Sequence, residues 1–217
     1  MIYLIADPHG GESMAGLEAF LRQAEKEDLL IILGDLGLQF ENTKENKAFT
    51  EWFLSLDYQI ALVEGNHENH PFLNRFPEEM WCGGRVNRLT EKIVRLQRGN
   101  LFVIENKTFF VMGGCKSSEK WKEMGLWYPG EEPNAEELRL GYETLAACHH
   151  RVDYILTHKY DVEQTKEPAE DPLSLLGLQR YLDRNVSFAH WYSGHWHRAF
   201  SVDEKHTVVY DNPVRIG

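Results

Sequence analysis

The chain has 217 residues, of which 42% are hydrophobic and 26% charged, and its mean hydropathy is −0.46. This balance is typical of a soluble globular protein and excludes a largely disordered chain, and the length predicts a single domain over residues 1–217. The 34 acidic residues outnumber the 23 basic ones and give a formal net charge of −11, so the surface is a poor match for the phosphates of bulk duplex nucleic acid.

The first third of the chain alternates continuous apolar runs with amphipathic segments. Strands are predicted at 2–6, 29–33 and 58–63, and helices at 13–27, with Ser13 as a cap, and at 43–55. Apolar runs without alternation indicate strands that are buried on both faces. This part of the chain therefore predicts βαβ units and a parallel sheet.

The pattern changes after residue 91. Short strands are predicted at 92–96, 101–105 and 107–112, with an antiparallel turn at Glu105-Asn106 between the last two. Residues 113–133 show little periodicity and predict a long ordered loop that flanks the active site. The remaining segments are predicted as helix 134–149 capped by Asn134, strand 152–157, helix 173–184, strand 187–193, and a closing hairpin of 198–203 and 206–211.

The three cysteines, Cys82, Cys115 and Cys148, form no C-x-x-C pair, so no disulfide framework is expected. The apolar run at the beginning of the chain ends at Asp7 and has no basic residues before it, which is not the pattern of a signal peptide. No apolar run reaches the roughly 20 residues that span a bilayer. We therefore expect a cytoplasmic protein without membrane contact, and the sequence leaves its oligomeric state open.

Five of the predicted buried strands end directly in side chains of the kinds that bind metal ions. Ligands of open α/β sheets bind outside the carboxyl ends of the strands, so these side chains are expected to converge on one crevice. Imidazole with carboxylate suits Zn, Fe, Mn or Ni rather than a thiolate site. The two Asp, one Asn and four or five His at these strand ends are too many ligand groups for one ion. We predict two divalent or transition metal ions, one bridging carboxylate and open positions for water and substrate. The strand-end side chains are Asp7, His9, Asp35, Asn66, His67, Glu68, His158, His195 and His197.

These residues form the ordered blocks D-x-H, G-D, G-N-H-E, H and G-H-x-H between residues 7 and 197. The ordered set resembles the calcineurin-like metallophosphoesterases, and residues 98–133 are similar to a small bacterial and phage subgroup of that superfamily. The resemblance implies an α/β fold, a four-layer α/β/β/α sandwich of two mixed β-sheets, with a dimetal site at the carboxyl ends of the strands.

The resemblance also implies a role for each residue of the motif. It places Asp7, His9 and His197 on the first metal, Asn66, His158 and His195 on the second, and Asp35 between the two. His67 is not a ligand in this pattern, and it is expected to protonate the leaving group or to clamp the phosphoryl group, so that Asn66 and His67 also contact the substrate. The attacking group would be a metal-bound hydroxide, without a covalent enzyme intermediate.

Several neighbouring residues are expected to have supporting or ordinary roles. Gly34, Gly65 and Gly194 are expected to permit the sharp exit from each strand and the approach of backbone to the ions. Glu68 is expected to orient a histidine ligand. Cys115 is expected to be a small buried residue rather than a nucleophile. Arg75 and Arg98 are expected to form surface ion pairs rather than to reach a substrate phosphate. The remaining histidines are expected to have no role in the site, namely His70, His149, His150, His190 and His206. Trp121, Trp127 and Tyr128 either wall the site, where they could stack a ring, or pack in the core.

The predicted function is a metal-dependent phosphoesterase acting on phosphodiesters or phosphomonoesters of small molecules or nucleotides. One alternative is a nuclease on short or single-stranded nucleic acid, and another is a protein-binding scaffold of the same fold without catalysis, against which the complete motif set argues. No arginine stands beside Asp35 or Gly65, where the Ser/Thr protein phosphatases of the superfamily carry one, so that branch is disfavoured.

Overall fold

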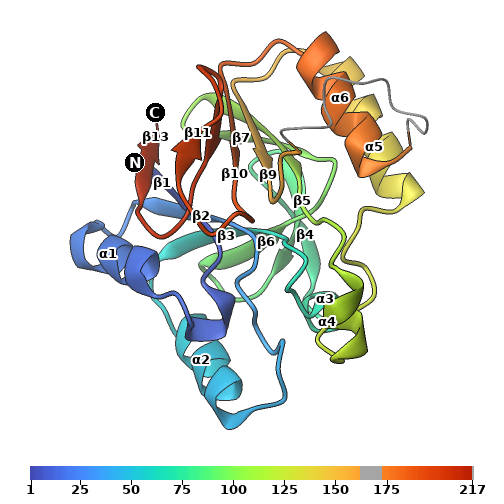
Figure 1. Ribbon diagram of the computed structural model, residues 1–217. Helices are drawn as coiled ribbons and strands as arrows, with labels where there is room; N and C mark the ends of the chain where they lie inside the picture. Colours follow the sequence, from blue (N-terminus) through green and yellow to red (C-terminus); the bar gives the residue numbers. More distant parts are fainter. Residues whose placement is uncertain (162–172, 217) are drawn as a thin grey trace.

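Two β-sheets pack face to face at the centre of the protein (Figure 1). The computed structural model describes residues 1–161 and 173–216. Within these residues the first sheet has seven strands, in the order β13 (Val214–Ile216), β1 (Ile2–Ile5), β2 (Leu29–Leu33), β3 (Gln59–Val63), β6 (Ile93–Leu96), β5 (Gly84–Arg88) and β4 (Glu78–Trp81). Its four central strands β1, β2, β3 and β6 are parallel, and the outer ones pair antiparallel.

The second sheet has six strands in the described part of the chain. Their order is β11 (Phe200–Ser201), β12 (His206–Val208), β10 (His190–Ser193), β9 (Tyr154–Thr157), β8 (Lys107–Met112) and β7 (Leu101–Ile104). Strands β8, β9, β10 and β12 are parallel, whereas the two edge strands are antiparallel to their neighbours. Both sheets are therefore mixed.

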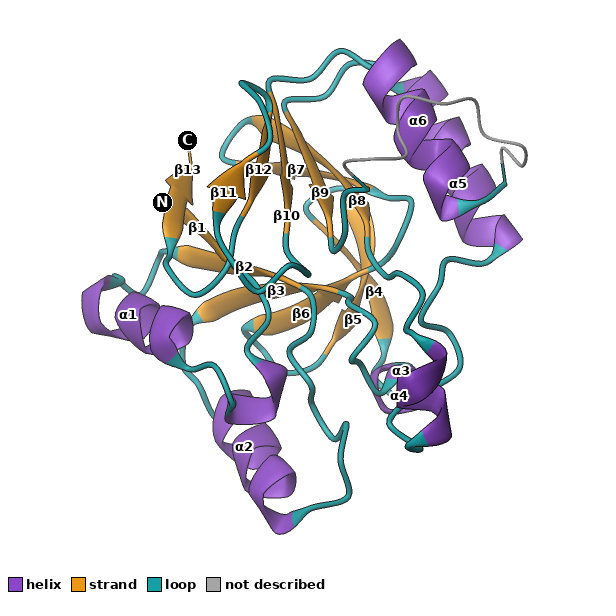
Figure 2. Cartoon of the chain, viewed as in Figure 1, coloured by secondary structure: helices purple, strands orange, loops and turns teal. Residues whose placement is uncertain are grey.

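The side-chain alternation of the strands divides the core into three apolar layers. Leu4 and Ile31 face the second sheet, where they join a cluster that includes Phe109. Their neighbours Ile5 and Ile32 face outward and pack on helices α1 (Ala15–Gln23) and α2 (Lys44–Leu54). A third cluster packs the outer face of the second sheet on α5 (Ala135–Ala147) and α6 (Leu175–Asn185). Figure 2 shows these helices outside the two sheets, and the predicted four-layer α/β/β/α sandwich is confirmed.

Of the two predicted helix caps, Asn134 forms and Ser13 does not, and Thr43 is a further cap. Thr43 accepts from the backbone N–H of Asn46 at 3.1 Å and caps α2, and Asn134 forms a full capping box with Glu137 at the start of α5. Ser13 does not cap α1, because the helix begins at Ala15 and Met14 occupies the cap position. The helix ends at Gln23, since the backbone of Ala24 is already extended.

Elements that carry little apolar pattern were not predicted. The hairpin of β4 and β5 lies at the edge of the first sheet, and β4 is mostly exposed, so alternation is weak there. The short helices α3 (His70–Leu73) and α4 (Glu119–Glu123), the 3-10 turn His9–Gly11 and strand β13 are too brief to show a period. Residues 113–133 are thus a loop that contains a short helix. No helix within the described residues is long and apolar enough to cross a bilayer.

His206, expected to be ordinary, is a buried structural residue on β12. Its Nε2 lies 3.0 Å from Asp183 Oδ1 and its Nδ1 lies 2.8 Å from Asp203 Oδ1, and its ring stacks on Tyr160. Burial opposes the charged form, but the two carboxylates outweigh it and raise the pKa of His206 above its ordinary value. The folded protein therefore holds a proton on His206 that the unfolded chain loses earlier as the pH rises.

This pairing predicts a pH-dependent contribution to stability. We expect His206→Gln to lower the free energy of unfolding by about 2 kcal/mol at about pH 5.5, because two charge-assisted hydrogen bonds are lost. The contribution is fully present below the ordinary histidine pKa of about 6.5 and disappears as the pH rises through the raised value, so the difference should shrink toward about pH 9. Urea unfolding of both proteins at the two pH values measures it, and a difference that is independent of pH would contradict the assignment.

Candidate metal centre

The carboxyl ends of the parallel strands from both sheets meet at one edge of the sandwich. Asp7, after β1, donates its backbone N–H to the carbonyl of Gly34 after β2 at 3.0 Å. The connection between the sheets is direct, because the backbone N–H of His195, after β10, donates to the Asp7 carboxylate at 2.9 and 3.2 Å. Gly194 donates to the carbonyl of His158, after β9, at 2.7 Å. Side chains far apart in the sequence are thereby brought to one place.

The backbone at these strand ends is unusual. Of the eleven non-glycine residues with positive φ in the described chain, five are predicted metal ligands, namely Asp7, His9, Asp35, His195 and His197. Such conformations cost energy for residues with a Cβ and are tolerated where the surrounding structure imposes them, often at functional sites. The concentration of positive φ at predicted ligands indicates that this edge of the sandwich is a functional site.

The first cluster of ligand atoms comes from the first sheet and the end of β10. Its members are Asp7, His9, Asp35 and His197, whose ligand atoms all lie within 4.8 Å of one another. The Nε2 atoms of His9 and His197 face each other at 2.8 Å, and His9 Nε2 lies 3.6 Å from Asp35 Oδ2. This set matches the four residues that the motif resemblance placed around the first metal.

The second cluster lies on the other side of Asp35. Asn66 Oδ1 lies 3.1 Å from His158 Nε2, which in turn lies 3.2 Å from His195 Nδ1 and 3.4 Å from Asp35 Oδ1. Asp35 thus presents one carboxylate oxygen to each cluster, as a bridging ligand would. The same cluster contains Cys115, which was not predicted to lie here.

The side chains of His158 and Asn66 are oriented by hydrogen bonds from the atoms that point away from the second cluster. His158 Nδ1 lies 2.8 Å from the carbonyl of Leu33, so this nitrogen is a donor and Nε2 is the ring atom turned toward the cluster. Asn66 Nδ2 donates to Ser117 Oγ at 3.0 Å, which turns Oδ1 inward. Two of the predicted ligands therefore point their ligand atoms at a common position.

The electrostatics of the buried carboxylates suit a bound cation. Burial raises the pKa of Asp7 to about 7, although the positive charge on His158 opposes the shift. Burial alone would also raise the pKa of Asp35, but the charge and hydrogen bond of His158 hold it below its ordinary value. The Asp35 carboxylate in turn raises the pKa of His158, against the effect of burial. A cation at this place would replace the proton that His158 shares with Asp35.

The imidazoles of His9 and His195 are held neutral, which is the form that binds metal. Burial lowers the pKa of His9 to about 4 and that of His195 to about 3. Imidazoles and buried carboxylates with facing ligand atoms fit two metal ions. Asp7, His9 and His197 would hold one, Asn66, His158 and His195 would hold the other, and Asp35 would be shared.

The three glycines at the strand ends leave room for these ligands. Gly34 has φ of +92°, and a Cβ there would overlap His158 Nδ1. A Cβ at Gly65 would overlap the carboxylate and backbone of Asp35, and one at Gly194 would contact Ala6 and the Asp7 carboxylate. The expected backbone freedom is thus required at Gly34, whereas at the other two the reason is close approach to ligand side chains.

A cavity of about 800 Å³ opens over both clusters. His67 stands in its wall, half-buried, and its backbone N–H donates to Asp35 Oδ1 at 2.8 Å. Its ring contacts His9, Phe40 and Trp121 with centroid separations of 4.8–5.1 Å. Burial lowers the pKa of His67, while the Asp35 carboxylate acts in the opposite direction. Of the loop aromatics, Trp121 walls the cavity, whereas the hydroxyl of Tyr128 donates to the carbonyl of Phe40.

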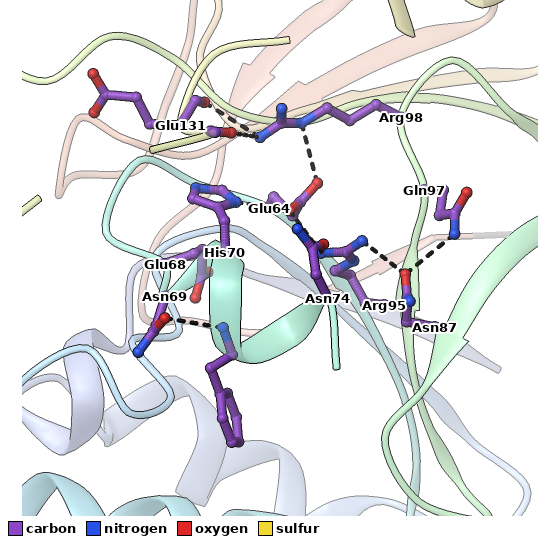
Figure 3. Close-up of polar contacts among 12 residues, drawn as sticks. Glu64, Glu68, Asn69, His70, Asn74, Asn87, Arg95, Gln97, Arg98 and Glu131 are labelled. Carbon is purple, nitrogen blue, oxygen red and sulfur yellow. Dashed lines mark hydrogen bonds and ion pairs between the residues drawn. The ribbon is translucent and has the colours of Figure 1, made fainter. Parts of the chain in front are cut away.

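The loop that carries Asn66 and His67 is anchored at both ends by buried carboxylates. Figure 3 shows Glu64 among His70, Arg95 and Arg98, at 2.9, 3.2 and 3.1 Å. Burial would raise the pKa of Glu64, but the two guanidinium groups hold it well below its ordinary value. Arg98 is therefore buried in an ion-pair network and not at the surface as expected, whereas Arg75 is exposed.

Glu68 anchors the other end, in a way that differs from the expectation. Its carboxylate accepts from the backbone N–H groups of Leu36 at 2.9 Å and Gly37 at 3.2 Å, so it holds the loop after Asp35 and orients no histidine. Burial, together with the negative charge of Asp35, raises the pKa of Glu68 to about 8. The loops after β2 and β3 are thereby held together beneath the two clusters.

Cys115 is the residue that sequence reasoning missed. It is buried, as expected, and burial raises the pKa of its thiol, which disfavours a nucleophilic role. A usable signal was present, because Cys115 follows the apolar strand β8 after Gly113-Gly114, and β8 is parallel to β9. The strand-end argument that selected His158 applies equally to this position.

A family model identifies the family of this chain. A family model described as calcineurin-like phosphoesterase matches residues 1–199, which include every strand-end residue described above. No curated protein matches the chain significantly. Among solved structures, a protein of unknown function from Aquifex aeolicus is 14% identical, with 87% of each chain covered and a TM-score of 0.43.

Proposed function

Because this chain belongs to the calcineurin-like phosphoesterase family, we propose that it hydrolyses phosphodiesters or phosphomonoesters of small molecules or nucleotides with two metal ions bound. The observation that carries the proposal is the arrangement of two clusters of ligand atoms on either side of the Asp35 carboxylate. When bound, two divalent ions neutralise phosphate oxygens and lower the pKa of a coordinated water toward neutrality.

The side chains of the cavity wall supply the remaining steps. Asn66 and His67 come from one loop, and both line the cavity over the clusters, where a phosphoryl group would lie. His67 is proposed to donate a proton to the leaving oxygen. Its pKa is lowered by burial in the free protein, and the negative charge of a bound phosphoester favours its protonated form.

The charges around the cavity favour a small substrate over a long polyanion. Lys116 and Lys159 line the cavity, and so do Glu12, Glu41 and Glu45. A nucleic-acid strand crossing this opening would meet carboxylates, and the whole chain carries a net charge of −11. We therefore favour small-molecule or nucleotide esters over short or single-stranded nucleic acid.

A metal-supplemented activity screen tests the proposal. We expect purified protein to bind about two equivalents of Mn, Fe, Zn or Ni and to cleave at least one class among model diesters, monoesters and cyclic nucleotides. Chelation should abolish the activity, and the same metal should restore it. Short oligonucleotides are the comparison, because a nuclease loses affinity steeply as salt rises. Protein that binds no metal under any of these conditions would overturn the proposal.

A further inference from the structure

The thiol of Cys115 occupies a position among metal-ligand atoms that no part of the proposed function uses. Its Sγ lies 3.0 Å from Asn66 Oδ1 and 3.7 Å from His195 Nδ1. Its distance to the ligand atom of His158 also falls within the 4.8 Å that encloses the cluster. The side chain is 2% exposed, so this placement is enforced by packing.

The separations within the cluster are those of ligand atoms around one small cation. Bonds of about 2.0–2.3 Å to nitrogen, oxygen and sulfur, at angles between a right angle and the tetrahedral angle, separate neighbouring ligand atoms by about 2.8–3.8 Å. Four contacts in the cluster are 3.0–3.7 Å long. They join Cys115 Sγ to Asn66 Oδ1 and to His195 Nδ1, and His158 Nε2 to the same two atoms. Small movements would bring all four onto a common ion.

The backbone before Cys115 is held against the site. Gly114 donates its backbone N–H to the carbonyl of Glu64 at 2.7 Å, and it has φ of +88°. A Cβ at Gly113 would press on the Glu64 backbone, so only glycine fits there. The Glu64 carboxylate is itself held by ion pairs with Arg95 and Arg98 (Figure 3). The segment from Gly113 to Cys115 is therefore fixed in place, with Cys115 beside Asn66.

We propose that Cys115 is a thiolate ligand of the metal ion held by Asn66, His158 and His195, an inference that rests on the metal centre of the proposed function. The metal–sulfur bond forms as the S–H proton leaves to solvent. The two positions then differ in chemistry, because the first has only nitrogen and oxygen ligands and the second adds sulfur. Thiolate favours Zn and Fe over Mn and Mg, so the second position is selective for the softer metals.

X-ray absorption of the zinc-loaded protein tests this ligand directly. We expect a zinc–sulfur distance of about 2.3 Å beside zinc–nitrogen and zinc–oxygen distances of about 2.0–2.2 Å. The sulfur signal should vanish in Cys115→Ser and Cys115→Ala. It should persist in Cys82→Ser and Cys148→Ser, the matched controls, because both of those thiols lie outside the cluster. Replacement of zinc by cobalt adds an optical check, since thiolate ligation gives a near-ultraviolet charge-transfer band.

Metal affinity gives a second readout that does not depend on turnover. We expect Cys115→Ser to bind one zinc as the wild type does and the other about 10- to 100-fold more weakly, with a smaller effect on manganese. Zinc bound without sulfur in the wild-type protein would overturn the assignment of Cys115 and leave the metal centre intact. Protein that binds manganese but no zinc would overturn the ligand role of Cys115 and leave the metal centre intact, whereas protein that binds none of the metals would overturn both. The wild-type spectrum decides the matter even if both variants fold poorly.

Discussion

Replacement of Asp35 by Asn is expected to release both metal ions and to lower turnover by about 10³-fold or more, since metal ions contribute several kcal/mol to phosphoryl transfer. Asn keeps the volume of Asp35 and an oxygen that can accept from the backbone N–H of His67. It removes the negative charge that faces His9 on one side and His158 on the other. Metal content and kcat measured on the same sample test the expectation.

Asp7→Asn is the matched control for this prediction. Asp7 belongs to the first cluster only, and its carboxylate also accepts from the backbone N–H of His195. We expect this variant to lose one metal ion and to keep most of the other. If Asp35→Asn also lost a single ion, Asp35 would not bridge, and the two clusters would have to be assigned to separate sites.

His67→Ala is expected to keep about two equivalents of metal and to lose about 10²- to 10⁴-fold in turnover of substrates whose leaving group is a poor one. His67 belongs to neither cluster of ligand atoms, so its loss should spare metal binding. A leaving group of low pKa departs without a proton. The loss of activity should therefore be small for an activated aryl ester and large for an alkyl ester.

The dependence on the leaving group separates the two roles considered for His67. An equal loss for both esters indicates that His67 clamps the phosphoryl group, and undiminished turnover of both removes it from the mechanism. His190→Ala is the control, because His190 lies on β10 with its Nε2 near Thr207 Oγ1 and does not line the cavity. That variant should retain the activity and metal content of the wild type.

Much of the architecture was predictable because the central strands carry their signal locally. Residues 29–33 form β2 with the predicted bounds, as a continuous apolar run indicates a strand buried on both faces. Thr43 and Asn134 were recognisable caps, since capping depends on residues within one turn. Strand β4 was not predictable, because its side chains are mostly exposed and its pairing depends on neighbours.

The candidate site, too, was predictable in part. The residue types at the strand ends, from Asp7 to His197, are a property of the sequence and by themselves indicate metal chemistry. Which of them share a cluster is decided by the packing of two sheets, because Asp7 and His195 meet only when β1 and β10 face each other. The same packing sets the side-chain orientations of Asn66 and His158 through Ser117 and Leu33.

Cys115 and Glu64 show most clearly what the tertiary structure adds to the sequence. In the sequence, Cys115 follows an apolar run and two glycines, which places it at a strand end but does not show which side chains it meets, and Glu64 is an acidic residue before a motif. In the folded protein, Cys115 lies beside Asn66, and Glu64 binds Arg95 and Arg98 in a buried network. Local sequence determines which segments become strands and where each strand ends. Contacts between segments some 30 to 190 residues apart depend on the tertiary structure. Pairing of β3 with β6 places Arg95 beside Glu64, and the packing of the two sheets brings Asp7 and His195 within hydrogen-bonding distance.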